Sequence, residues 1–408
     1  MFVIEGKYAK AKIFQDPEFV ETSCIEQIKT IVDSKAVEGS DISIMPDAHT
    51  GSSVCIGFTQ TFIDRVVPNF VGVDIGCGML VTRFSGPATK KYFGTQKSLE
   101  NLDKLVRERI PLGMTGRTTK HRYAEDFNWL KDLRAKGIDI EQELLKISTI
   151  GGGNHFIEVD VDEIGDYYLV IHTGSRHLGV AVANYYQKLA AKNCNNSSYD
   201  KKLLIEKLKS EGRQSEIQEE LLKLKVEKIP DDLCYLEGQD LKDYLHDMEI
   251  VQLYAEINRL AVAEEICRGL GIEDKIIDTF STIHNYIDVV DKVVRKGAIS
   301  LKAHEKAIIP LNMRDGSLIV VGKGNTEWNM SGPHGAGRLM SRTQAKQTLS
   351  LKDFEDQMKN VFSTSVGPQT LDESPNAYKP VESIIQNIGQ TCDIVKRIKP
   401  VWNLKAGE

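Results

Sequence analysis

The chain has 408 residues, of which 41% are hydrophobic and 27% charged, and this composition is that of a globular protein that can bury a sizeable core. Its formal net charge of −6 excludes a generally basic nucleic-acid coat protein, but not a local basic groove, because phosphate binding depends on where the charges lie. Its seven cysteines include no CxxC pair, which excludes a regular disulfide framework, so we expect a reducing compartment, the cytoplasm.

The N-terminal third begins with a segment, residues 1–14, whose apolar residues are interrupted by charged ones. We expect neither a secretory signal there nor a membrane-spanning helix elsewhere in the chain. Residues 40–85 are rich in glycine and contain two β-like runs, 41–45 and 70–74. Between these runs Asp47 and His49 form an Asp-x-His pair, which could support metal ligands from behind.

The glycine-rich turn GVDIGCG, residues 72–78, places Asp74 and Cys77 three positions apart. A carboxylate and a thiolate at this spacing could bind one metal ion or bridge two, and the glycines would let the backbone approach an ion closely. A buried cysteine beside a turn aspartate is the alternative explanation, and this motif alone does not decide between them.

The segment GGGNHFIE, residues 151–158, brings His155 directly after three glycines and Asn154. In a strand, Asn154 and Glu158 would face one side and His155 the other, so a metal ligand and a ligand-binding acid could serve different parts of one site. A histidine that caps the end of a strand is the alternative explanation.

A third β-like run, residues 168–172, ends at His172. Arg176 follows four positions later, and its guanidinium offers a fork of donors that suits phosphate oxygens.

The central region, residues 198–270, is dominated by Lys, Glu and Leu with apolar positions every three or four residues. This period predicts helices. We expect residues 198–230 to form a solvated helical excursion at the periphery and residues 240–270 to form one long helix, with an interruption near Gly269.

The last third contains SGPHGAGR, residues 331–338, in which small residues leave His334 accessible. A histidine can act as a covalent nucleophile in phosphoryl chemistry. Arg338 and Arg342 are four positions apart, so on a helix they would share one face, and a helix N-terminus attracts anions. We predict helices over about 341–361 and about 380–398; a tight turn before a helix is the alternative reading of the glycine segment.

His284 lies between apolar residues in IHNYI, a setting more typical of a core histidine. However, His155, His172 and His334 all stand in glycine-containing turns, and their joint occurrence with Asp74 and Cys77 is hard to explain by packing. The sequence therefore predicts a metal-dependent enzyme whose site draws on both ends of the chain. We expect a single large intertwined α+β domain over 1–408, with mixed β-sheets around a central metal cleft and peripheral helices.

Three nucleotide and metal motifs are absent from the sequence: the GxxxxGK[ST] phosphate loop, the KxDG segment of lysine-nucleophile nucleotidyl ligases, and HExxH. If the protein activates a phosphate through a covalent nucleotide, histidine is the better candidate for the nucleophile.

These segments, in this order, resemble the RtcB family of RNA ligases. DIGCGM, GNHFIE and HGAGRxxSR are the most specific parts of the resemblance, which spans nearly the whole chain. The matching stretches are MPDAHTG (45–51), VGVDIGCGM (71–79), GGGNHFIEV (151–159), HTGSR (172–176), IHNYI (283–287), RKGAIS (295–300), HGAGRLMSR (334–342), AYK (377–379) and Lys405.

The resemblance implies an enzyme that uses GTP and two Mn²⁺ ions to join an RNA 3′-phosphate or 2′,3′-cyclic phosphate end to a 5′-hydroxyl end, in RNA repair or tRNA splicing. His334 would carry GMP as a phosphoramidate. The implied metal ligands are Asp74, Cys77, His155, His172 and His284. The implied nucleotide contacts are Asn154, Glu158, Ser317, Gly335, Tyr378 and Lys405, while Arg176, Lys296 and Arg338 would grip phosphates.

The sequence departs from the usual family pattern at a few positions. Asn312 stands where a nucleotide-contacting serine is expected, Arg314 and Asp315 are additional charges, and Ser53 replaces a common glycine. We expect these changes to affect substrate range more than metal binding or guanylylation.

Two other functions fit the same residues less well. A metal-dependent cyclic phosphodiesterase would open cyclic phosphates without forming an enzyme–GMP adduct. A non-catalytic RNA- or metal-binding protein would not need the full set of catalytic candidates. We expect a monomer, because the segment 198–230 is more polar than an obligate interface. The resemblance also implies a possible helper protein, because some family members use one.

Overall fold

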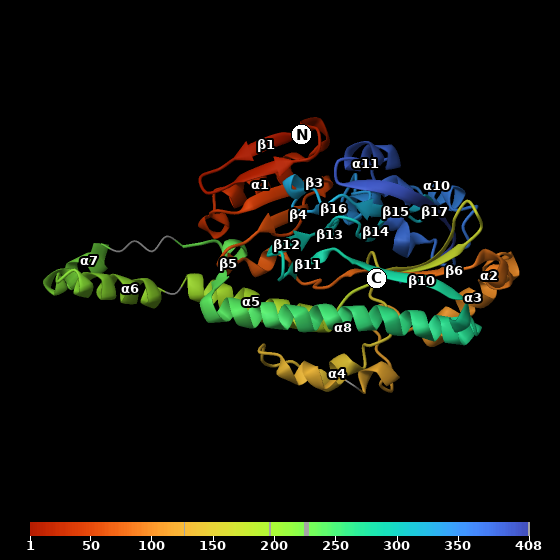
Figure 1. Cartoon of the computed structure of the whole chain (residues 1–408), viewed down its shortest axis with the longest axis horizontal. Coiled ribbons are helices and arrows are strands. Elements are labelled where there is room, and N and C mark those ends of the chain that lie inside the picture. The colour runs from red at the N-terminus through yellow and green to blue at the C-terminus, as the bar shows by residue number, and fades with distance from the viewer. Residues whose placement is uncertain (126, 196, 224–227, 407–408) are drawn as a thin grey trace.

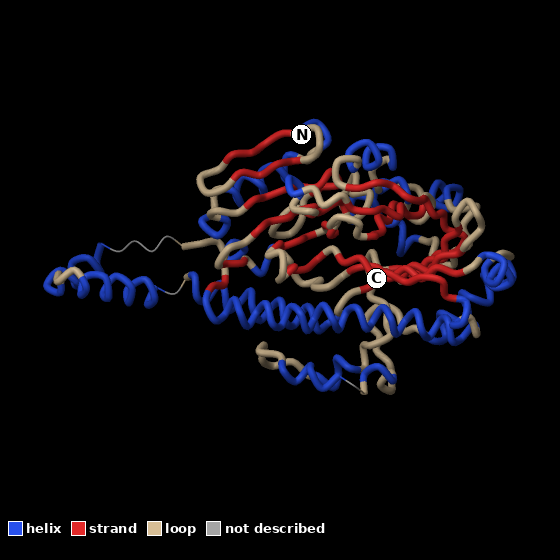
Figure 2. Tube along the Cα trace, viewed as in Figure 1, coloured by secondary structure: helices blue, strands red, loops and turns tan. Residues whose placement is uncertain are grey.

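A computed structural model describes residues 1–125, 127–195, 197–223 and 228–406. Two β-sheets form the body, and a long helix runs along one side of it (Figures 1 and 2). Each sheet combines strands from the first and the last parts of the chain. The predicted α+β fold with intertwined segments is thereby confirmed. Among the described residues, no helix has the length and apolar character that crossing a membrane requires.

The first sheet has six strands, and its β2–β3 pair is parallel while its other pairs are antiparallel, so the sheet is mixed as expected. It buries one face against α1 (Thr22–Val32), which presents Cys24, Ile28, Ile31 and Val32 to the core. In spatial order its strands are β1 (Phe2–Glu5), β2 (Lys10–Ile13), β3 (Asp41–His49), β4 (Ile56–Thr61), β12 (Val293–Lys296) and β11 (Asn285–Asp288).

The second sheet has seven antiparallel strands. Its interior strand β8 is buried along its whole length, which explains why its sequence, YYLVIHT, is a nearly continuous apolar run rather than an alternating one. In spatial order the strands are β10 (Ile276–Ile283), β6 (Gly78–Phe84), β8 (Tyr167–Thr173), β7 (Phe156–Val161), β17 (Cys392–Lys405), β15 (Gly316–Gly322) and β14 (Lys306–Asn312).

The long helix α8 (Gly238–Leu270) packs against β6 and β8 and against α3 and α5. It passes through Gly269 without a break and ends because Gly271 adopts a left-handed conformation, with φ of 65°. The expected interruption near Gly269 is therefore wrong, and the predicted single helix over 240–270 is confirmed.

The remaining helices lie at the edges of the body, and two short strand pairs join loops (Figure 1). The helices are α2 (Gly86–Phe93), α3 (Gln96–Arg109), α4 (Ile140–Leu144), α5 (Arg176–Cys194), α9 (Arg342–Thr348), α10 (Leu351–Gln357) and α11 (Val381–Ile388). The pairs are β13 (Ala298–Ser300) with β16 (Ser331–Pro333), and β5 (Arg65–Val66) with β9 (Leu236–Glu237).

The described part of the segment 198–230 forms α6 (Ser197–Ser210) and α7 (Ile217–Lys223), which lie away from the body at the left of Figure 1. Residues 224–227 of this segment lie outside the described residues. The assignment of the whole chain to one domain with this excursion inside it stays a prediction.

Three predicted elements differ from the structure. Residues 70–74 are not a strand: Phe70 ends a short 3-10 helix (Pro68–Phe70), Val71 follows it, and both are apolar because they fill the core. The helix predicted over 341–361 is two helices, α9 and α10, because Ser350 caps a new helix through its hydroxyl. The helix predicted over 380–398 ends at Ile388, and the chain then enters β17, where pairing with β7 and β15 decides the conformation.

Candidate active site

Most of the predicted site residues surround one cavity of about 320 Å³ between the two sheets. Segments distant in the sequence contribute to its wall, from the end of β3 to the end of β17. The predicted residues that line it are Asp74, Asn154, Glu158, His172, His284, Lys296, His334, Gly335, Arg338, Tyr378 and Lys405.

Cys77, His155 and His172 form a buried thiol–imidazole cluster at one side of this cavity. The Cys77 sulfur lies 3.2 Å from Nε2 of His155 and 3.2 Å from Nε2 of His172. All three ligand atoms lie within 4.8 Å of one another, which is the arrangement of groups that share a metal ion. Asp74 approaches from the glycine-rich turn, with Oδ2 3.9 Å from Nε2 of His155.

Strand register brings this cluster together. On β8, His172 pairs with Met79 of β6 on one side and with Phe156 of β7 on the other, so Cys77 and His155, which precede these strands, end beside it. His284 follows the neighbouring strand β10, and its backbone N–H donates to the Cys77 carbonyl at 2.9 Å. Its ring packs against that of His172, with centroids 5.1 Å apart.

The buried imidazoles of the cluster are held neutral. Burial, followed by the nearby charge of Arg176, lowers the pKa of His155 to about 3. Burial also lowers the pKa of His172 and of His284 well below the ordinary value. Neutral imidazole is the form that binds metal ions. Nδ1 of His284 is buried and has no hydrogen-bond partner among the described residues.

Two adjacent residues of α8 hold the loops that carry these ligands. Asn258 exchanges hydrogen bonds with the backbone of Thr149 and donates to the Gly174 carbonyl. The fully buried guanidinium of Arg259 donates to the carbonyls of Gly76 at 2.8 Å and Thr173 at 3.0 Å. The long helix therefore fixes the three loops that supply Asp74 and Cys77, His155, and His172.

His334 lies across the cavity, after β16, with its ring 5.1 Å from that of His284. Its Nδ1 and its backbone N–H both contact Oδ2 of Asp47, at 2.8 and 3.2 Å. Asp47 is fully buried in β3, and a carboxylate can only accept, so Nδ1 carries the proton and the lone pair is on Nε2. Asp47 thus contacts His334 rather than a member of the metal cluster.

Glu373 is a buried carboxylate that does not line the cavity itself but contacts residues that do. It accepts hydrogen bonds from the Tyr378 hydroxyl at 2.8 Å and from the Lys405 ammonium, and it pairs with Arg338 at 3.3 Å and Arg342 at 2.8 Å. Burial alone would raise the pKa of Glu373, but the cations, led by Lys405, lower it to about 2. One carboxylate thus orients four residues that line the cavity.

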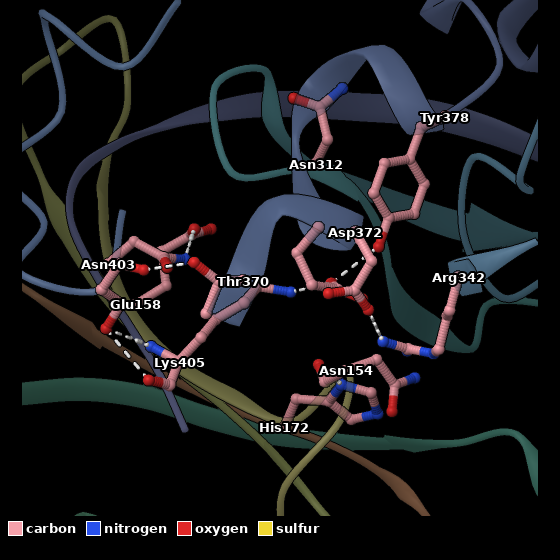
Figure 3. Close-up of polar contacts among 12 residues, drawn as sticks. Asn154, Glu158, His172, Asn312, Arg342, Thr370, Asp372, Tyr378, Asn403 and Lys405 are labelled. Atoms are coloured by element: carbon pink, nitrogen blue, oxygen red, sulfur yellow. Dashed lines mark hydrogen bonds and ion pairs between the residues drawn. The ribbon is translucent and has the colours of Figure 1, made fainter. Parts of the chain in front are cut away.

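Figure 3 shows the far end of the cavity, where Glu158 and Asn403 lie beside Lys405, and Arg342 and Tyr378 lie opposite. Asn403 of β17 pairs with Glu158 of β7 across the strands, and its amide donates to Oε2 of Glu158 at 2.5 Å. Glu158 and Asn403 are nearly completely buried, so this end is a specific polar pocket and not an open surface.

Some predicted residues do not face the cavity. Cys77 and His155 lie behind His172. The guanidinium of Arg176 donates to Thr149 Oγ1 and to the Gly113 carbonyl, and the residue is not part of the cavity wall. Ser317 is fully buried in β15, and its hydroxyl has no partner among the described residues. The roles predicted for these residues stay predictions.

The expected helix that carries Arg338 and Arg342 on one face is wrong. Arg338 lies in an extended segment bridged to Tyr378, and α9 begins only at Arg342. The two guanidinium groups nevertheless meet at Glu373 because the chain turns between them.

Asn312, the departure noted in the sequence, lines the cavity at the end of β14. Its side chain accepts from the backbone N–H groups of Arg314 and Asp315 and donates to the Asp315 carboxylate at 2.8 Å. Asn312 therefore closes the β14–β15 turn.

The sequence did not single out Asn258, Arg259, Glu373 or Asn403. The first two are ordinary polar residues in a helical stretch, and Asn403 is one polar residue in an apolar run. The DE pair in LDESP, just before the AYK stretch, was the one signal that could have indicated Glu373.

Comparisons with known proteins agree with this geometry. The family model "tRNA-splicing ligase RtcB" matches residues 27–406, a range that contains every site residue named above. RNA-splicing ligase RtcB of Escherichia coli (strain K12) is 30% identical over 401 residues, which cover 89% of this chain and 90% of that protein. The tRNA-splicing ligase RtcB of Nanoarchaeum equitans is 24% identical over 501 residues, covering 98% and 96%. That of Thermococcus kodakarensis is 24% identical over 443 residues, covering 88% and 86%.

Because the family model covers nearly the whole chain and the predicted site residues converge on one cavity, this protein belongs to the tRNA-splicing ligase RtcB family.

Proposed function

We propose that the protein is an RNA ligase that joins an RNA 3′-phosphate or 2′,3′-cyclic phosphate end to a 5′-hydroxyl end, with GTP as co-substrate and His334 as the residue that carries GMP. The names of the relatives, which are RNA- and tRNA-splicing ligases, support RNA as the substrate class. RNA repair and tRNA splicing are the processes in which such ends arise.

The observation that carries the proposal is the contact between His334 and Asp47. Since Nδ1 donates to a buried carboxylate, Nε2 is left as the nucleophilic atom, and it belongs to a residue of the cavity wall. Asp47 also stabilises the positive charge that the ring acquires as Nε2 attacks. A histidine held in this way is suited to forming a bond to phosphorus.

The chemistry then has three steps. Nε2 of His334 bonds to the α-phosphorus of GTP, and the bond from that phosphorus to the bridging oxygen breaks, releasing pyrophosphate. An oxygen of the RNA 3′-phosphate attacks the same phosphorus and breaks the N–P bond, which moves GMP onto the RNA end. The 5′-hydroxyl oxygen of the second RNA attacks the 3′-phosphorus, loses its proton to water, and displaces GMP. A cyclic phosphate would first be opened by water to a 3′-phosphate.

The donor set of the thiol–imidazole cluster fits a divalent metal ion, since it combines one sulfur with neutral imidazoles. Cys77, His155 and His172 would hold it, with Asp74 and His284 as further ligands for a second ion. When bound, two Mn²⁺ ions would offset the charge of the triphosphate and of the transferring phosphoryl group. The protein's own contribution is to keep these imidazoles neutral by burial.

The opposite end of the cavity would bind the nucleotide. Glu158 and Lys405 offer an acceptor and a donor to a base, Tyr378 adds an aromatic surface, and Asn154 and Gly335 also line the cavity. Arg338 and Lys296 would meet phosphate oxygens. Burial lowers the pKa of Lys296, whose ammonium donates to the Val71 carbonyl at 2.7 Å. Arg176 and Ser317 do not line the cavity, so they would support the residues that do.

The test is incubation of the intact protein with α-labelled GTP and Mn²⁺, followed by denaturing electrophoresis. The label should remain covalently attached, be acid-labile as a phosphoramidate is, and disappear in His334→Ala. His304→Asn is the matched control, because His304 is an exposed histidine with a left-handed backbone that asparagine tolerates. That variant should label like the wild type.

If metal-loaded wild-type protein formed no adduct, the ligase function would be excluded. If such protein still opened a 2′,3′-cyclic phosphate, the cyclic phosphodiesterase would be the correct function. The cytoplasmic location, the monomeric state and the use of a helper protein stay predictions.

A further inference from the structure

Two buried polar residues, Asp160 and Asn403, lie next to Glu158, and the proposed reaction gives them no role. We call these two residues the inner layer. Asp160 lies two positions after Glu158 on β7, so both side chains are on the same face of the sheet. Glu158 is 3% exposed, Asp160 0% and Asn403 1%, so bulk water reaches none of them. Their hydrogen bonds must therefore be made with one another or with a ligand.

The carboxyl groups of Glu158 and Asp160 lie within hydrogen-bonding reach of each other. An ionised carboxylate has no donor, so this contact requires one proton between the two groups. No described residue donates a hydrogen bond to either oxygen of Asp160. On the neighbouring strand β8, the residue opposite is Tyr168, whose hydroxyl donates to Asp162 instead.

These contacts place the proton on Asp160. A buried carboxylate without a donor or a cation is strongly unfavourable. Glu158 receives the Asn403 amide and lies near the Lys405 ammonium, whereas Asp160 has neither. Accordingly, burial raises the pKa of Asp160 well above its ordinary value. Burial raises the pKa of Glu158 less, because Asp160, Asn403 and Lys405 counteract it.

We propose that Asp160 and Asn403 are positioning residues for base recognition: each donates a hydrogen bond to Glu158, which stays a single anion and directs its remaining lone pairs into the cavity. This inference rests on the proposed function and adds the means of base selection. An anion held in this way fits two adjacent N–H donors on one edge of a purine.

Guanine has two such donors, N1–H and the 2-amino group. Hypoxanthine retains only N1–H, and adenine has an acceptor at N1. The inner layer therefore selects GTP over ITP, and ITP over ATP. A protonated Glu158 would itself present a donor, and the preference for GTP over ITP and ATP would be lost.

The experiment compares adduct formation on His334 with GTP, ITP and ATP in wild-type protein and three variants. Asp160→Leu removes the donor and keeps the branched shape of the side chain, and Asp160→Asn restores a donor as an amide. Asp162→Asn is the matched control, because Asp162 is a buried carboxylate two positions further that contacts Lys396 and Tyr168.

We expect Asp160→Leu to lose about tenfold or more of its selectivity for GTP over ATP, with the change in KM and not in kcat. Asp160→Asn should stay within about threefold of the wild type, and Asp162→Asn should match the wild type. The proposal is overturned if Asp160→Leu keeps the wild-type selectivity, or if Asp160→Asn loses as much as Asp160→Leu. Absence of any adduct in the wild type is a different result, which refutes the proposed function.

A second measurement does not depend on the leucine variant folding. The infrared spectrum of the wild type at neutral pH should contain the carbonyl stretch of a protonated carboxylic acid. This band should be absent from the spectrum of Asp160→Asn, so that it appears in the difference spectrum between the two proteins. A wild-type spectrum without that band overturns the proposal.

Discussion

The guanidinium of Arg259 donates a hydrogen bond to the backbone carbonyl of Gly76 at 2.8 Å, and through this contact the long helix holds the turn that carries Cys77. Gly76 has a left-handed backbone, with φ of 71°, so the turn has a shape that few other residues could maintain. The same guanidinium donates to Thr173, next to His172. A buried guanidinium whose hydrogen bonds with described residues all go to backbone carbonyls thus sets the separation of two candidate metal ligands.

Replacing Arg259 should therefore weaken the metal cluster without touching a ligand. In Arg259→Met, two buried carbonyl groups lose their donor, and we expect about 2–4 kcal/mol less free energy of unfolding, together with less bound Mn²⁺. Urea unfolding and elemental analysis measure the two effects. Arg268→Met, an exposed arginine on the same helix, should change neither. Full metal content in Arg259→Met would show that the turn keeps its shape unaided.

Cys77→Ala should remove the one sulfur ligand of the cluster. We expect the bound Mn²⁺ per chain to fall and the His334 adduct to be lost, because the imidazoles of His155 and His172 contact this sulfur. Cys267→Ala is the control, since Cys267 is buried in α8 and packs in an apolar cluster. Metal content by elemental analysis separates the two variants, and equal metal content in both would contradict the ligand role of Cys77.

Asp47→Asn should slow guanylylation while leaving GTP bound. The amide cannot stabilise a positive imidazole, and it permits the wrong tautomer of His334, so we expect the rate of adduct formation to fall about 100-fold or more. The measurement is single-turnover labelling over a range of pH, compared with the KM for GTP. Asp41→Asn, an exposed aspartate at the start of the same strand, should behave like the wild type. A larger change in KM than in rate would mean that Asp47 acts on binding.

Glu373→Gln should change how stability depends on pH. The pKa of Glu373 is about 2 in the folded protein, below its ordinary value of 4.5, so its carboxylate stabilises the fold above about pH 4.5. This stabilisation is lost as the pH falls from 4.5 toward 2. The wild type should lose roughly 3 kcal/mol more free energy of unfolding than Glu373→Gln over that interval.

Urea unfolding at several pH values measures this difference, with Glu382→Gln, an exposed glutamate of α11, as the control. Parallel pH curves for the wild type and Glu373→Gln would show that the paired cations do not stabilise the ionised form of this carboxyl.

The sequence by itself determined which residues are candidates for the chemistry. Turns rich in glycine around Asp74, Cys77, His155 and His334 are local patterns, because backbone flexibility and ligand chemistry are both encoded within a few residues. The long helix over 240–270 was predictable for the same reason, since a helical period repeats locally.

Only the tertiary structure decided how these residues act. The pairing of β7 with β17 puts Asn403 beside Glu158, and the packing of β3 under the His334 turn puts Asp47 on Nδ1, across separations of 245 and 287 residues. It also made a strand of residues 392–405, where local preference alone suggested the end of a helix. Contacts of this range depend on sheet register and burial, which no short stretch of sequence contains.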